Sequence, residues 1–196
     1  MASNFGKTIQ VSTFGASHGY AIGGIVEGLP CGHTIDIDEL QAFLKRRAPG
    51  QNQLQTQRKE ADIPEFLAGM VDGMLSGSPL AFMIRNTSQH SGDYNNLRDI
   101  PRPSHADFTA RMRYGDKVDM RGGGHFSARL TAPLCVAGGI ALQLLREKGI
   151  EIHGHLKQVG SIQDVPIDMV HPDMQALAHI ATKPIAMVDA NKRTEV

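Results

Sequence analysis

Residues 15–19 place a hydroxyl and an imidazole side by side between glycines, in the order Gly-Ala-Ser-His-Gly. A polar, glycine-flanked turn between two apolar alternating runs predicts a loop that joins two strands, and loops often carry catalytic groups. Imidazole titrates near neutrality, so His18 could protonate a leaving phosphate or bind it as a cation, with Ser17 beside it. A lone loop histidine is more often only solvated, so this turn needs support from other segments.

The same turn matches the G-x-S-x-G pattern of serine hydrolases at Gly15, Ser17 and Gly19. In those enzymes the serine lies on a strained turn that leads from a strand into a helix. Here the turn joins two expected strands, which disfavours a nucleophilic serine.

Basic side chains form a second group. Arg46 and Arg47 end an expected helix, and Arg58 and Lys59 follow in a polar loop. Guanidinium groups bind phosphate and carboxylate through paired hydrogen bonds, so several of them in one pocket would suit a ligand that carries both groups. The alternative is a set of solvated cations, which the helix dipole favours at a C-terminus.

Residues 102–107 read Arg-Pro-Ser-His-Ala-Asp and predict a short helix. Ser104 would be its N-cap, with Asp107 three positions later. His105 would then hold the first helical position, where the dipole favours a neutral imidazole that can pass on a proton. A plain capped surface helix remains the alternative.

A glycine-rich segment at residues 121–129 leads into the most apolar helix that the sequence predicts. Its glycines let backbone amides approach an anion, and Arg121 and Arg129 add positive charge near a helix N-terminus. We expect it to stabilise a phosphate or the anionic edge of a flavin ring, although a simple turn before a buried helix fits as well. It matches neither the dinucleotide fingerprint nor the P-loop.

Hydrophobic periodicity places these segments between regular elements. Alternating apolar residues predict strands at residues 8–14, 23–26, 66–71, 80–84 and 150–159. Apolar spacings of three and four predict helices at residues 36–48 and 128–148, the first opened by Asp36 and Glu39. Beyond Asp164 the pattern is weak.

The composition excludes several classes of function. The 20 basic and 20 acidic residues give a net charge of zero, and there is no Trp, so nothing favours a nucleic acid or a membrane as partner. Cys31 and Cys135 are too few and too distant for a disulfide framework or a zinc site. A metal-dependent hydrolase is weakly supported, because only His153 and His155 are closely spaced. Without an apolar leader segment, the protein is expected to be cytoplasmic.

The motifs together, and in this order, resemble chorismate synthase. The sequence GASHGYAIGGIVEGLP at residues 15–30 is similar to the first signature of that family, and GHFSARLTAPLCVAGGI at residues 124–140 is similar to the second. RRAPG, RPSHADF and RGGG lie between them in the expected places. The chain departs from the family pattern at Ala16, Gln53, Ser104 and Cys135, and it has no counterpart to the third signature.

The resemblance implies an α/β sandwich of sheets and helices, and a 1,4-elimination of phosphate from 5-enolpyruvylshikimate-3-phosphate that requires reduced FMN. It implies catalytic roles for His18 and His105, the latter toward the flavin. The implied substrate-binding residues are Ser17, Arg47, Arg58, Arg102 and Arg129. The residues implied to line the flavin are His125, Phe126 and Ser127, with Arg121 adding charge at the same place.

The resemblance also implies that the chain is the N-terminal portion of a longer polypeptide. We expect residues 1–196 to form a single domain, the full-length protein to be a homotetramer, and this half alone to be inactive. The rival hypothesis is a non-catalytic module whose basic loops bind a phosphorylated metabolite or a partner. Substrate-dependent binding of FMN would separate the two.

Overall fold

The computed structural model describes residues 3–48, 60–87, 100–180 and 182–195. The chain groups into two compact units, Met1–Glu147 and Lys148–Val196. Each unit is described by itself, and the expectation of a single domain stays a prediction.

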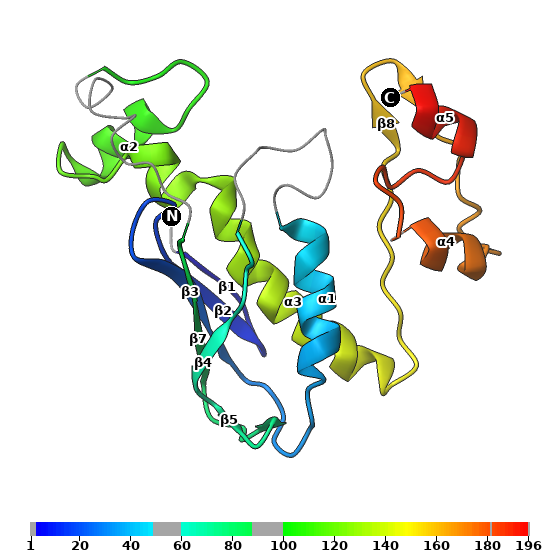
Figure 1. Ribbon diagram of the computed structural model, residues 1–196, viewed down its shortest axis with the longest axis horizontal. Coiled ribbons are helices and arrows are strands. Elements are labelled where there is room, and N and C mark those ends of the chain that lie inside the picture. The colour runs from blue at the N-terminus through cyan, green and yellow to red at the C-terminus, as the bar shows by residue number, and fades with distance from the viewer. Residues whose placement is uncertain (1–2, 49–59, 88–99, 181, 196) are drawn as a thin grey trace. The chain divides into compact units, whose positions relative to one another are not determined.

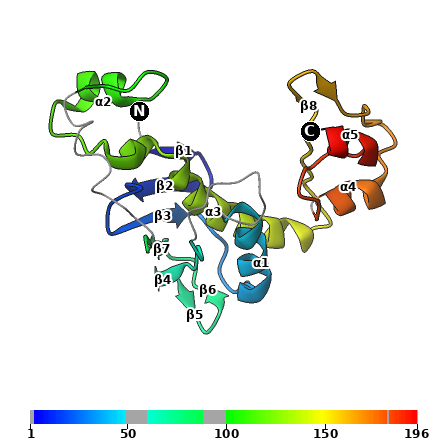
Figure 2. The ribbon, with the colours of Figure 1, turned by 45° about the horizontal axis from the view of Figure 1, so that its top comes forward.

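A five-stranded antiparallel sheet is the base of the first unit, with the order β1-β2-β3-β7-β4. Its strands are β1 (Asn4–Gly6), β2 (Gln10–Gly15), β3 (Ala21–Glu27), β4 (Glu65–Ala68) and β7 (Leu80–Arg85). A separate hairpin pairs β5 (Met70–Val71) with β6 (Met74–Leu75), as Figure 2 shows. The predicted strands at residues 8–14, 23–26 and 80–84 are therefore confirmed, whereas residues 66–71 divide between two sheets.

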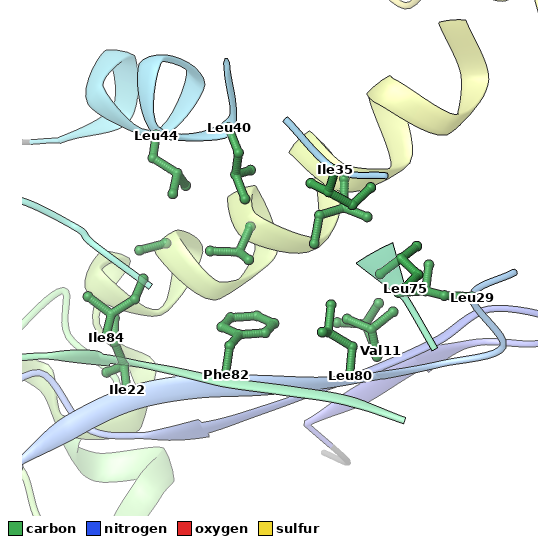
Figure 3. Packing of buried hydrophobic residues seen from close by; sticks show 14 of the residues in the cluster. Val11, Ile22, Leu29, Ile35, Leu40, Leu44, Leu75, Leu80, Phe82 and Ile84 are labelled. Atoms are coloured by element: carbon green, nitrogen blue, oxygen red, sulfur yellow. The ribbon is translucent and has the colours of Figure 1, made fainter. Parts of the chain in front are cut away.

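Helices α1 (Ile37–Arg47) and α3 (Thr131–Arg146) lie side by side on the sheet (Figure 1). Figure 3 shows the core between the helices and the sheet, where Leu40 and Leu44 of α1 point toward Phe82 and Leu80 of β7. All four side chains are at most 1% exposed. This layer of helices on a sheet confirms the predicted α/β class.

Helix α1 begins where the sequence predicts, whereas α3 begins at Thr131, after the predicted start at Ala128. The Asp36 carboxylate caps α1 by accepting a hydrogen bond from the Glu39 amide at 2.8 Å, and three basic residues fill the last turn. α3 follows two short 3₁₀ segments, η2 (Arg121–Phe126) and η3 (Ala128–Leu130). Residues 128–146 are long and apolar enough to cross a membrane, but half of this stretch is buried inside the unit, which is typical of a core helix.

The short helix α2 (Asp107–Tyr114) starts later than predicted. Ser104 has a φ of +60° and lies outside the helix, so it is not the N-cap. Ala106 takes that position without a side-chain hydrogen bond. His105 is therefore not at the first helical position, and the predicted effect of the helix dipole on it is wrong.

The second unit contains a hairpin of β8 (Gln158–Val159) and β9 (Ile162–Gln163), and the helices α4 (Met174–Ile180) and α5 (Ala190–Glu195). Of the predicted strand at residues 150–159, only the last two residues are extended in a ladder. Asp164 joins the hairpin to the following chain, because its carboxylate accepts hydrogen bonds from the amides of Val188 at 2.6 Å and Asp189 at 2.9 Å. These long-range bonds have no signature in a local pattern of apolar residues.

Candidate active site

The turn at residues 15–19, hereafter the His18 turn, packs against the glycine-rich loop at residues 121–125. The Ser17 amide donates to the Gly124 carbonyl at 3.1 Å, and the Ser17 hydroxyl donates to the Arg121 carbonyl at 3.2 Å. From the other side, His125 Nδ1 donates to the Gly15 carbonyl at 2.8 Å. Two segments that are distant in the sequence thus form one structural feature.

Glycine at position 122 is required by this packing. A Cβ built on Gly122 would overlap the imidazole of His18, and the residue has a φ of +60°. Only glycine adopts such a conformation without strain and without a side chain in the way. The loop therefore leaves room for His18, which is 9% exposed, while Ser17 is 1% exposed.

The hydrogen bonds of Ser17 define which nitrogen of His18 can exchange a proton. His18 Nδ1 lies 3.2 Å from Ser17 Oγ. Because the hydroxyl proton of Ser17 is directed at the Arg121 carbonyl, Nδ1 is the donor in this pair. Nε2 then carries a proton only when the imidazole is protonated, in a ring whose orientation the Ser17 contact helps to fix.

Asp119 also belongs to the candidate site, although no pattern in the sequence indicates it. Arg121 holds its carboxylate through Nε at 2.9 Å and Nη2 at 2.8 Å. These hydrogen bonds keep the pKa of the Asp119 carboxyl below its ordinary value, and the nearby His18 acts in the same direction. An ionised Asp119 attracts the positive charge of a protonated His18 and neutralises part of the charge that was assigned to Arg121.

Arg47 and Arg129 converge on a carboxylate of the chain itself. Arg47 reaches Asp62 Oδ2 through Nε at 3.0 Å and Nη2 at 2.8 Å, and Arg129 Nη1 binds Asp62 Oδ1. The sequence predicts that these arginines bind a ligand, and it gives no sign that they also share the carboxylate of Asp62. The polar stretch around Asp62 has no periodicity that could have revealed it.

Arg129 also connects to the His18 turn through Asn86. Its Nε donates to Asn86 Oδ1 at 3.1 Å, and the Asn86 amide donates to the carbonyls of Ala16 at 3.0 Å and Gly19 at 2.8 Å. Arg129 is 6% exposed, and its Nη2 has no hydrogen-bond partner in the described part of the chain. A buried guanidinium N–H without a partner is costly, so this atom is suited to receive an anionic oxygen.

Arg102 pairs with Asp107 across the start of α2. Its Nε lies 2.7 Å from Oδ2 and its Nη2 lies 2.9 Å from Oδ1. These hydrogen bonds lower the pKa of the Asp107 carboxyl from its ordinary value. Arg102 Nη2 also donates to the Met120 carbonyl at 3.2 Å, which places this segment beside the glycine-rich loop.

His105 is exposed, and its Nδ1 donates to the Pro103 carbonyl at 2.9 Å. His105 comes shortly after Arg102, whose side chain donates a hydrogen bond to the Met120 carbonyl. Arg58 lies outside the described residues. His153, from the metal-site alternative, pairs with Glu151 at 2.9 Å in the second unit, and the described residues contain no group of three or more side chains that could hold a metal ion.

The residues expected to line a flavin divide into two kinds. His125 and Ser127 make internal bonds, since His125 Nε2 lies 2.6 Å from Ser3 Oγ and Ser127 Oγ accepts from the Arg129 amide at 3.2 Å. The ring of Phe126, 38% exposed, lies 6.2 Å from the half-exposed ring of Tyr114. These two rings provide apolar surface of the kind that an isoalloxazine ring would cover, so the residues fit a flavin in part.

Comparisons with known proteins agree on one family. The family model described as chorismate synthase matches residues 9–196. Chorismate synthase of Lancefieldella parvula is 46% identical over 90% of this chain, and that of Bacteroides fragilis is 43% identical over the whole chain. A crystal structure of chorismate synthase superposes with a TM-score of 0.69 over 96% of this chain at 24% identity, which is a likeness of fold.

The chain spans about half the length of these relatives. It covers 46% of the Lancefieldella protein, 53% of the Bacteroides protein and 51% of the chain in the crystal structure. The residues described above therefore correspond to about half the length of these relatives.

Proposed function

The chain belongs to the chorismate synthase family, and we propose that the complete protein eliminates phosphate from 5-enolpyruvylshikimate-3-phosphate to give chorismate, with reduced FMN bound. The observation that supports this most is the packing of the His18 turn on the glycine-rich loop, together with the connection to Arg129 through Asn86. Alone, residues 1–196 are proposed to be inactive, and the remaining active-site residues are proposed to lie outside them.

His18 is proposed to protonate the departing phosphate. The bond between the ring carbon and the phosphate oxygen breaks as Nε2 of protonated His18 gives its proton to that oxygen. The electrons of a ring C–H bond shift into the new diene, and that proton is proposed to pass to a base that lies outside residues 1–196. Ser17 helps to fix the orientation of the imidazole through Nδ1, and ionised Asp119 attracts the positive charge of its protonated form. A positioned general acid of this kind contributes roughly 10²- to 10⁴-fold to a rate.

The arginines are proposed to hold the anionic groups of the substrate. Arg129 has one N–H group without a hydrogen-bond partner, and the Arg47 side chain keeps 20% of its surface exposed while bound to Asp62. Arg102 is fixed by Asp107 near the same loop, and Arg58 is proposed to join this set. Guanidinium groups bind phosphate and carboxylate through paired hydrogen bonds in the ground state and in the transition state alike.

Reduced FMN, when bound, supplies electron density to the allylic system of the substrate. We propose that the exposed ring of Phe126 contacts it, and that Arg121 lies at its edge. His125 and Ser127 support the flavin site by holding the loop in place. His105 is proposed to set the protonation state of the reduced flavin. The protein is further proposed to be a cytoplasmic homotetramer.

Anaerobic turnover tests this proposal. The complete protein is mixed with reduced FMN and 5-enolpyruvylshikimate-3-phosphate, and the absorbance of chorismate is followed. We expect turnover by the complete protein and none by residues 1–196 alone. Binding of the phosphorylated ligand by the complete protein without flavin binding and without chorismate would instead support the non-catalytic module.

A further inference from the structure

Asp62 is the best buried carboxylate of the candidate site, and no family motif quoted above includes it. Its side chain has no exposed surface, and its backbone has a φ of +50°, which is unusual for a residue with a side chain. Such strain persists only where the surroundings enforce it, often at functional sites. One carboxylate thereby binds two guanidinium groups, one from the end of α1 and one from the segment before α3.

Among the residues that the structure describes, the charges next to Asp62 balance. Arg47 and Arg129 are opposed by Asp62 and by Glu60, whose Oε2 accepts from the Thr87 amide at 3.1 Å and lies 3.9 Å from Arg129 Nη2. Two cations and two carboxylates cancel, which makes their burial tolerable. The distance of 3.9 Å is too long for a hydrogen bond, so Glu60 does not satisfy Nη2.

Asp62 and Asn86 together use two of the three nitrogens of the Arg129 guanidinium. Asp62 takes Nη1 and Asn86 takes Nε, which leaves Nη2 as the nitrogen without a hydrogen-bond partner in the described chain. Because a guanidinium is planar and rigid, fixing two nitrogens fixes the direction of the third.

Asn86 extends the same hydrogen-bond network to the His18 turn. Its side-chain amide donates to the two carbonyls that flank Ser17 and His18, and its backbone amide donates to Tyr20 at 3.1 Å. A continuous path of hydrogen bonds thus runs from Arg47 through Asp62, Arg129 and Asn86 to the His18 turn.

We infer that Asp62 and Asn86 are positioning residues for the elimination: Asp62 aligns the two arginines that bind the substrate, and Asn86 sets the distance between Arg129 and the His18 turn. The inference rests on the proposed function, because the arginines and His18 must act on one substrate. Neither residue touches the substrate. Both act by fixing groups that do, and misplacement of such groups by about 1 Å can cost on the order of 100-fold in rate.

Steady-state kinetics of the complete protein test the inference with two variants. In Asp62→Asn the arginines lose their common anchor, so ground-state and transition-state binding weaken together. We expect KM for 5-enolpyruvylshikimate-3-phosphate to rise on the order of 10- to 100-fold with kcat within about threefold of wild type. In Asn86→Ala the His18 turn loses its supports, so kcat falls on the order of 10- to 100-fold.

Glu65→Gln is the matched control. Glu65 also binds an arginine through both carboxylate oxygens, but it lies 41% exposed at the sheet edge with Arg85. KM and kcat of this variant should stay within about twofold of wild type, since an exposed ion pair contributes little. If Asp62→Asn does not fold, Asn86→Asp decides. It keeps the acceptor for Arg129 but replaces the donors to the turn with a carboxylate oxygen that the Ala16 and Gly19 carbonyls repel, so kcat should fall with little change in KM.

The possible outcomes separate the two proposals. A wild-type protein that produces no chorismate overturns the proposed function and this inference with it. A wild-type protein that turns over, beside Asp62 and Asn86 variants with lower unfolding temperatures but unchanged KM and kcat, overturns the inference alone, because these residues are then only structural. The split between KM and kcat described above supports both.

Discussion

The imidazole of His18 fills the space that a Cβ on Gly122 would need. Two loops that are distant in the sequence are therefore complementary in shape at the ring that is proposed to protonate the phosphate. Hydrogen bonds from Ser17 to Gly124 and from His125 to Gly15 hold the same contact on either side.

Substitution of Gly122 tests this contact. Gly122→Ala should displace the His18 ring and lower kcat/KM of the complete protein by about 100-fold. Gly123→Ala is the control, since Gly123 also has a positive φ but its nearest neighbour, Ser127 Cβ, is at an ordinary 3.5 Å. An equal loss in both variants would mean that backbone strain, and not contact with His18, is responsible.

Replacement of His18 tests its role as a general acid. His18→Ala should lower kcat by roughly 10²- to 10⁴-fold, while substrate binding changes much less. His33→Ala is the comparison, because His33 pairs with Glu147 away from the site and its loss should leave kcat unchanged. Retention of wild-type kcat by His18→Ala would remove this histidine from the mechanism.

The ion pair of Arg102 and Asp107 makes stability depend on pH. Hydrogen bonds from Arg102 lower the pKa of Asp107 in the folded protein, so the pair stabilises above the ordinary value of about 3.9 and is lost as pH falls below it. Asp107→Asn should lower the thermal unfolding midpoint at pH 7 and have a smaller effect at pH 3. An equal effect at both pH values would contradict this assignment.

Packing between α1 and α3 is tested by two neighbouring glycines. A Cβ on Gly139 would lie 2.5 Å from Leu40 Cδ1, whereas a Cβ on Gly138 has no neighbour within 4 Å. We expect Gly139→Ala to destabilise by about 1–3 kcal/mol through overpacking. Gly138→Ala should stabilise by about 0.5–1 kcal/mol through helix propensity. Chemical denaturation measures both, and a reversed order would contradict the packing of these helices.

Local patterns predict the layers of the first unit well. Alternation marks β2, β3 and β7, and the capping signal at Asp36 and Glu39 marks α1, because these elements bury regular apolar faces. The start of α2 is different. Ser104 has the chemistry of an N-cap, but Asp107 is bound by Arg102, and the helix begins at Asp107 instead.

Local sequence patterns predict the candidate site less completely than they predict the fold. The four motif segments indicate His18, Arg47, Arg102 and Arg129, since each has a chemical group in a distinctive setting. Asp62, Asn86 and Asp119 have no such setting, because their importance comes from partners that are distant in the sequence. Only the tertiary structure shows that one carboxylate serves two arginines and that one amide supports the His18 turn.

A crystal structure of the complete protein with 5-enolpyruvylshikimate-3-phosphate and FMN bound would test whether His18 and Arg129 act on one substrate. We expect a phosphate-ester oxygen within about 2.6–3.2 Å of His18 Nε2 and an anionic oxygen of the substrate on Arg129 Nη2. A substrate bound away from the His18 turn, with water on Arg129 Nη2, would contradict it.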